Sequence, residues 1–178
     1  HRLNVSINIS ARQFAGQDLA RLFRNTVQAT GLAAGMLYFE ITESMLMGDV
    51  EKARRILSDL RDEGGKFYLD DFGTGYSSLS YLKRLPLDGL KIDRSFIRDI
   101  ATDMDSRAIA SAIVSLAKTL NMAIVAEGVE TLEHLHILDA MSAMLIQGYL
   151  ASPPVPAADF TSLLQQGKGL LPEERAQA

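Results

Sequence analysis

The sequence predicts an α/β protein whose parallel sheet belongs to a (β/α)8 barrel, with about six of the strands present in this chain. Strand-like and helical segments alternate about six times, and such alternation is typical of a parallel sheet. Every predicted strand ends in a polar or charged residue. Barrels of this type collect their active sites at the C-terminal ends of the strands. A doubly wound sheet would normally carry a glycine-rich phosphate loop, so the strand ends favour the barrel.

The first half of the chain predicts three strands and two helices. Residues 3–9 alternate between apolar and polar side chains, which indicates a half-buried strand. Residues 18–30 place apolar side chains at helical spacing and stop before a glycine. Residues 36–42 are the next predicted strand. Residues 49–63 are an amphipathic helix that stops at two glycines, and residues 66–69 are a short buried strand.

The second half repeats the same alternation. The first of its helices stops before a proline, and the second is long and apolar. Helices are expected at residues 78–84, 106–120, 132–141 and 157–166, and strands at residues 89–93, 123–130 and 144–149. We expect residues 167–178 to be a flexible tail.

Composition and charge narrow the class of protein. The 178 residues are 47% hydrophobic and 22% charged, which suits one domain with a substantial core. The net charge of −4 gives no basic surface for a DNA or RNA polymer. Cysteine is missing from the sequence, and no apolar run is long enough to span a bilayer. We expect a cytoplasmic domain excised from a longer protein, which could itself be anchored in a membrane.

Two adjacent carboxylates, Asp70 and Asp71, follow the strand at residues 66–69. Alternate strand residues point to opposite faces, so both can reach one site only if the chain turns there. Gly73 and Gly75 are expected to supply that turn. A divalent cation such as Mg²⁺ or Mn²⁺ would relieve the repulsion between the two carboxylates. The alternative is an acidic surface turn in which Asp71 caps the next helix.

The other strand ends also carry polar groups that we expect to face one site. The full set is Asn8, Glu40, Asp70, Asp71, Lys91, Asp93, Glu127 and Gln147. Some of these residues have an ordinary alternative. The role of Asn8 could be limited to hydrogen bonding, and Lys91 and Asp93 could be a structural pair. Glu43, three residues after Glu40, could simply suit the positive end of a helix.

The donors in this set are oxygen atoms, which suit one or two magnesium or manganese ions. Two ions about 3.5–4 Å apart, bridged by a carboxylate, are the usual device for phosphodiester hydrolysis. Asp70 is the best candidate for the bridge, and Lys91 could contact the attacking water. The three histidines lie away from the strand ends, so a Ser-His-Asp or Cys-His mechanism is not indicated.

Six ordered motifs resemble those of the EAL domain family, which hydrolyses the bacterial second messenger cyclic di-GMP to linear pGpG. The motifs are SINISARQF (6–14), EITES (40–44), DDFGTGYSSL (70–79), LKIDRSF (90–96), AEGVET (126–131) and QGYL (147–150). The resemblance runs from Leu3 to about Leu164. It implies that residues 1–166 are an EAL domain that lacks its N-terminal strands.

The resemblance also implies the metal ligands. Asn8, Glu40 and Asp70 match ligands of one Mg²⁺ or Mn²⁺ ion. Asp70, Asp71 and Glu127 match ligands around a second ion, and Glu127 is also expected to be catalytic.

Five further residues take roles from the same resemblance. Lys91 matches the lysine that contacts the catalytic water. Asp93, Glu130 and Gln147 match residues that line or support the site. Glu43 matches the glutamate that stabilises the loop after the two aspartates.

The chain departs from the family pattern in two ways. The Glu-Ala-Leu motif, with a metal-binding glutamate and a phosphate-binding arginine, has no counterpart, and about two strands are missing with it. We therefore expect the isolated chain to be inactive or nearly so, and to associate through open strand edges. Ala143-Met144 replaces the usual Cys-Asp, and Ala151 stands where an aromatic residue is common.

The resemblance implies cyclic di-GMP as ligand, a homodimer formed through the helix after the strand at residues 89–93, and fused sensory or diguanylate cyclase domains in the parent protein. Two other functions stay open. One is an inactive EAL-type receptor that binds cyclic di-GMP without cutting it. The other is an unrelated acid-rich barrel enzyme such as an enolase-like lyase, which explains the carboxylates but not the six motifs.

Overall fold

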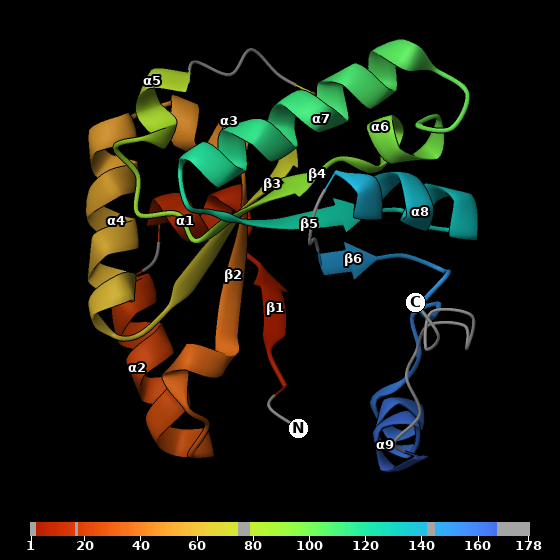
Figure 1. Cartoon of the computed structure of the whole chain (residues 1–178). Coiled ribbons are helices and arrows are strands. Elements are labelled where there is room, and N and C mark those ends of the chain that lie inside the picture. Colours follow the sequence, from red (N-terminus) through yellow and green to blue (C-terminus); the bar gives the residue numbers. More distant parts are fainter. Residues whose placement is uncertain (1–2, 17, 75–78, 142–144, 167–178) are drawn as a thin grey trace.

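A single parallel sheet of six strands organises the computed structural model, which describes residues 3–16, 18–74, 79–141 and 145–166. Neighbouring strands follow each other in sequence order, and the sheet curls (Figure 1). The strands are β1 (Val5–Asn8), β2 (Leu37–Thr42), β3 (Lys66–Phe72), β4 (Gly89–Ile92), β5 (Ala123–Glu127) and β6 (Leu145–Gln147). The predicted parallel, barrel-type sheet is confirmed. Four features named above lie outside the described residues: Gly75, Ala143, Met144 and the tail from residue 167.

Helices connect the strands and lie mainly on the outer side of the curled sheet (Figure 1). The α-helices are α1 (Ala11–Gly16), α2 (Leu19–Thr30), α3 (Glu43–Met47), α4 (Val50–Asp62), α5 (Leu79–Leu82), α6 (Arg94–Arg98), α7 (Met104–Thr119), α8 (Leu132–Ala140) and α9 (Ala157–Gln166). A 3₁₀ helix, η1 (Ala34–Met36), precedes β2. The predicted helices are all found, whereas α1, α3 and α6 were not predicted.

Aspartate caps explain why two predicted helices begin one residue early. Asp18 accepts a hydrogen bond from the backbone N–H of Arg21, and Asp49 accepts one from that of Lys52. These residues are therefore N-caps just outside α2 and α4, because a cap satisfies an amide that the first helical turn leaves free. The apolar periodicity located both helices correctly. The predicted boundaries differ by one residue because the prediction counted the N-cap residue as part of each helix.

The hydrophobic core lies between the sheet and its outer helices. Ile41, Leu69 and Leu90 have no exposed surface, and each is one residue away from a polar side chain of the site. The opposite, inner face carries Tyr38 and Tyr68, which line a cavity together with Glu40 and Val125. Strand alternation therefore separates an apolar outer face from a polar inner face.

The short helices α3 and α6 start where β2 and β4 end. Glu43 is the first residue of α3, and Asp93 caps α6 by accepting a hydrogen bond from the Ser95 amide at 2.9 Å. These two predicted site residues therefore sit at junctions between a strand and a helix. In the part of the chain that is described, no helix has the length and apolar character needed to cross a membrane.

Candidate metal centre

A lysine and three carboxylates from four consecutive strands meet on the inner face of the sheet. Nζ of Lys91 in β4 lies 2.6 Å from Glu40 Oε2 in β2, 3.1 Å from Asp70 Oδ1 in β3 and 2.5 Å from Glu127 Oε1 in β5. The Lys91 side chain is only 3% exposed and that of Glu40 8%. The interpretation of Lys91 and Asp93 as a structural pair is wrong, because Lys91 binds these three carboxylates and Asp93 caps a helix.

The charges of this cluster depend on one another. Burial lowers the pKa of Lys91, but hydrogen bonds to Glu127 and Glu40 outweigh it, so the pKa is raised and the ammonium stays charged. Burial raises the pKa of Glu127 above its usual value, against the opposing effect of Lys91, and the nearby carboxylates of Asp70 and Glu40 raise it further. One buried ammonium therefore faces three carboxylates in this cluster.

A bulge in β3 lets two adjacent aspartates reach the same site. The pairing of β3 with β4 shifts register between Leu69 and Phe72, and Asp71 has a positive φ of 54°. Only a few non-glycine residues adopt this left-handed conformation, and aspartate is among those that tolerate it best. The predicted turn of the chain at the two aspartates is present. The turn begins at Asp71 inside the strand, before the glycine at position 73.

Carboxylate oxygens of Asp70, Asp71 and Glu127 lie within 4.8 Å of one another, close enough to share one cation. Burial raises the pKa of Asp71, and the facing carboxylates of Asp70 and Asp93 raise it further. Hard oxygen donors at this spacing suit magnesium, manganese or calcium. The residues present therefore fit a divalent metal ion.

An open cavity of about 550 Å³ lies beside these carboxylates. It brings together five predicted site residues: Asp71, Asp93, Glu127, Glu130 and Gln147. Among the described residues that line it, Arg94 is the one that carries a positive charge, and Tyr149 contributes an exposed aromatic ring. Sequence reasoning gave neither of them a role, although both lie inside quoted motifs. The sequence feature that could have drawn attention to Arg94 is its position directly after Asp93, the N-cap of α6.

A close contact between backbones fixes one wall of this cavity. A Cβ atom added at Gly148 would lie 2.2 Å from the carbonyl oxygen of Val129, so only glycine fits there. The Val129 amide donates to the Gln147 carbonyl at 3.1 Å, and the Leu150 amide donates to Val129 at 3.0 Å. These contacts hold the segment after β6 against the segment after β5, which places Gln147 and Glu130 around the same cavity.

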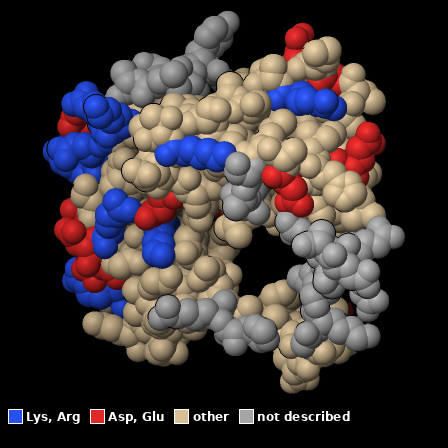
Figure 2. Space-filling model, in the orientation of Figure 1, with Lys and Arg blue, Asp and Glu red and all other residues tan. Residues whose placement is uncertain are grey.

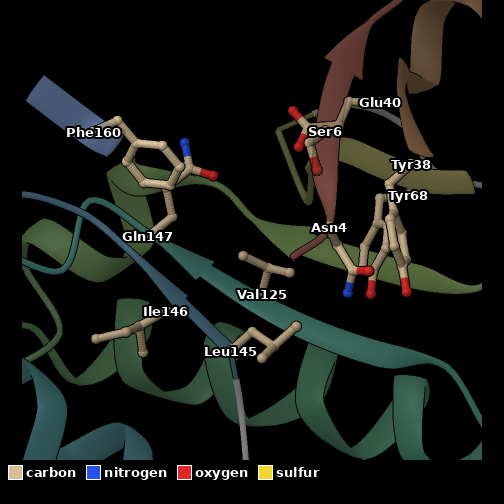
Figure 3. Close-up of a pocket in the computed structure, with 10 residues that line it drawn as sticks. All are labelled: Asn4, Ser6, Tyr38, Glu40, Tyr68, Val125, Leu145, Ile146, Gln147 and Phe160. Atoms are coloured by element: carbon tan, nitrogen blue, oxygen red, sulfur yellow. The ribbon is translucent and has the colours of Figure 1, made fainter. Parts of the chain in front are cut away.

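A second cavity, of about 600 Å³, lies on the inner face of the sheet (Figure 3). Figure 3 shows Asn4, Tyr38 and Tyr68 on one side and Gln147 and Phe160 on the other. The space-filling view is hollowed between the β1 and α9 sides of the molecule (Figure 2). Glu40, a partner of Lys91, and Gln147, which also lines the cavity of about 550 Å³, both line this second cavity.

The remaining predicted residues lie nearby, but their roles stay predictions. Asn8 pairs with Glu40 in the register of β1 with β2, and its side chain is exposed. Glu43 is buried in the first turn of α3. The loop that Glu43 was expected to stabilise includes residues 75–78, which lie outside the described part of the chain.

Comparison with protein families gives one match that covers most of the chain. The family model described as "EAL domain" matches residues 1–154. Among curated relatives, "Cyclic di-GMP phosphodiesterase NbdA" of Pseudomonas aeruginosa is 44% identical over 164 residues, which are 92% of this chain and 21% of that protein. The bifunctional diguanylate cyclase and cyclic di-GMP phosphodiesterase MucR of the same organism is 47% identical over 86% of this chain and 22% of its own length.

Solved structures agree in fold. The MucR phosphodiesterase in complex with c-di-GMP matches with a TM-score of 0.85 at 46% identity, over 88% of this chain and 64% of that one. A manganese and cyclic di-GMP complex of BlrP1 from Klebsiella pneumoniae matches with a TM-score of 0.80 at 34% identity, over 86% of this chain and 39% of that one. The chain spans about a fifth of the length of the two curated relatives.

Proposed function

We propose, because this chain belongs to the EAL domain family, that the protein containing it hydrolyses cyclic di-GMP to linear pGpG. The observation that carries the proposal is the convergence of Glu40, Asp70, Asp71 and Glu127 around Lys91, beside a cavity of about 550 Å³. Relatives named as cyclic di-GMP phosphodiesterases, and neighbouring structures that contain this ligand, support the same substrate. We further propose that residues 1–166 belong to one EAL domain.

Two divalent ions, Mg²⁺ or Mn²⁺, are proposed at this site. Asn8, Glu40 and Asp70 would hold one, and Asp70, Asp71 and Glu127 the other, with Asp70 shared. When bound, the ions acidify a water and offset charge on the phosphodiester. The manganese complex of BlrP1 and the spacing of the carboxylate oxygens support a metal-dependent reaction.

The chain's own residues have three proposed tasks. Lys91 positions the attacking water and offsets charge that develops on the phosphate. Asp93, Glu130 and Gln147 line the substrate cavity and support its walls. Glu43 stabilises the loop that follows the two aspartates.

The proposed setting is that of a bacterial signalling protein. We propose fused sensory or diguanylate cyclase domains in the whole protein, and a homodimer formed next to α6. MucR, whose printed name includes a cyclase activity, supports the first of these two proposals.

Incubation of the whole protein with cyclic di-GMP and Mg²⁺ or Mn²⁺ tests the activity. We expect chromatography to show linear pGpG, and expect EDTA to abolish it. Binding of cyclic di-GMP without product would contradict hydrolysis and would identify a receptor. Glu133→Gln is a suitable control, because Glu133 also lies just after β5 and carries a carboxylate but is not among the residues that line the cavity.

A further inference from the structure

Lys91 forms ion pairs with three of the carboxylates around it. A lysine ammonium has three N–H donors and no acceptor. Its nitrogen here contacts three acceptors, one each from Glu40, Asp70 and Glu127, at 2.5–3.1 Å. The contact with Glu40 has the geometry of a hydrogen bond, and those with Asp70 and Glu127 are ion pairs.

The same contacts place the positive charge of Lys91 between the three carboxylates. Three carboxylates that converge in a buried place repel one another unless a cation lies between them. Within the described part of the chain, the ion pairs of Glu40, Asp70 and Glu127 are those with Lys91. The almost complete burial of Lys91 means that water screens little of this repulsion if the lysine is removed.

We propose that Lys91 is a positioning residue that holds Glu40, Asp70 and Glu127 together before a divalent cation binds, and that it gives up at least one of these contacts when the cation binds. The inference rests on the proposed function only in taking Asp70 and Glu127 as metal ligands. Lysine and metal then compete for the same oxygens, so each weakens the hold of the other. A donor that Lys91 releases becomes available to a water at the same place.

Lys91→Met in the whole protein tests the exchange, because methionine keeps most of the side-chain volume without the charge. We expect the Tm in EDTA to fall by at least about 5 °C, and expect saturating Mn²⁺ to restore most of the loss. Titration calorimetry should show the variant binding Mn²⁺ about tenfold more tightly than the unchanged protein, because the competing cation is gone. An equal Tm loss with and without Mn²⁺, or an unchanged or weaker affinity, overturns the proposal.

Lys66→Met is the matched control. Lys66 also lies on the inner face, on the strand next to β4, but its amine donates to the Tyr38 hydroxyl at 3.2 Å. Any loss of Tm in this variant should be the same in EDTA and in Mn²⁺. A loss that Mn²⁺ repairs equally in both variants would show a general effect of the metal and would overturn the role given to Lys91.

A double variant keeps the test decisive if Lys91→Met does not fold in EDTA. Adding Glu127→Gln removes one of the uncompensated carboxylates, so the double variant should be more stable without metal than Lys91→Met alone. Equal or lower stability overturns the proposal. None of these measurements uses turnover. A protein that fails to hydrolyse cyclic di-GMP but shows this pattern refutes the proposed function and leaves the inference about Lys91 standing.

Discussion

The ring of Tyr68 lies directly against Gly89, its partner in the pairing of β3 with β4. A Cβ atom at Gly89 would lie 2.2 Å from the Tyr68 ring and 3.0 Å from the carbonyl oxygen of Ala123. The missing side chain thus makes room for an aromatic ring that lines the inner cavity two residues before Asp70. Burial of the ring raises the pKa of Tyr68, so its hydroxyl stays neutral.

Gly89→Ala should therefore destabilise the fold, because neither the ring nor the backbone of β5 can move aside freely. We expect a loss of roughly 1–3 kcal/mol in the free energy of unfolding, measured by urea denaturation. Gly35→Ala is the control, since an added Cβ at Gly35 meets nothing within 4 Å. Equal stability of the two variants would mean that the Tyr68 ring has another place to go.

Asp70→Asn should cost more activity than Glu43→Gln. Asp70 is proposed to be shared by two ions and also contacts Lys91, so the substitution removes charge at the centre of the site. Glu43 is proposed to act only through the order of a neighbouring loop. Initial rates of pGpG formation across a Mn²⁺ titration check this. Equal losses of activity with equal metal affinity would argue against a bridging Asp70.

Arg94→Met should weaken binding of cyclic di-GMP by about tenfold, because Arg94 is the cation among the described residues lining an otherwise acidic cavity. The rate at saturating substrate should change much less than KM, because Arg94 is not among the residues around Lys91. Arg98→Met is the control, since Arg98 lies on the same helix but pairs with Asp99. If both substitutions raise KM equally, the change in KM comes from the net charge of the protein and not from a contact of Arg94 in the cavity.

Asp103 should make the stability of α7 depend on pH. Hydrogen bonds from Ser106 hold the pKa of Asp103 below its usual value, against a small opposing effect of burial. A lowered pKa in the folded state means that the stabilisation is complete above the unfolded pKa of about 3.9 and is lost as pH falls through the folded value. Asp103→Asn keeps a capping side chain without the titration, so its Tm should fall less between pH 5 and pH 2.5. Parallel curves for the two proteins would contradict this role.

Local patterns were sufficient to predict most of the fold. The alternation of apolar periods located the strands and the longer helices, and the polar strand ends located the face that carries the site. The short helices α1, α3 and α6 were missed because five or six residues give too little periodicity to distinguish them from turns.

The sequence predicted which residues make up the site better than it predicted how those residues contact one another. Lys91 was expected to contact the attacking water, with a pair to Asp93 as the alternative, and its carboxylate partners on β2, β3 and β5, up to 51 residues away in sequence, were not predicted. Only the register of the strands decides which of these side chains meet. The bulge at Asp71 was also invisible, because a non-glycine residue with positive φ leaves no pattern in the sequence.

The order of the cluster residues along the chain also determines when the cluster around Lys91 can form during synthesis. Its members arrive from the ribosome in the sequence Glu40, Asp70, Lys91 and Glu127, one on each successive strand. A nascent chain that ends before β5 carries both aspartates but lacks the last carboxylate of the cluster. Newly made protein therefore completes this cluster only after residue 127 of the 178 has been translated, when β5 pairs with β4.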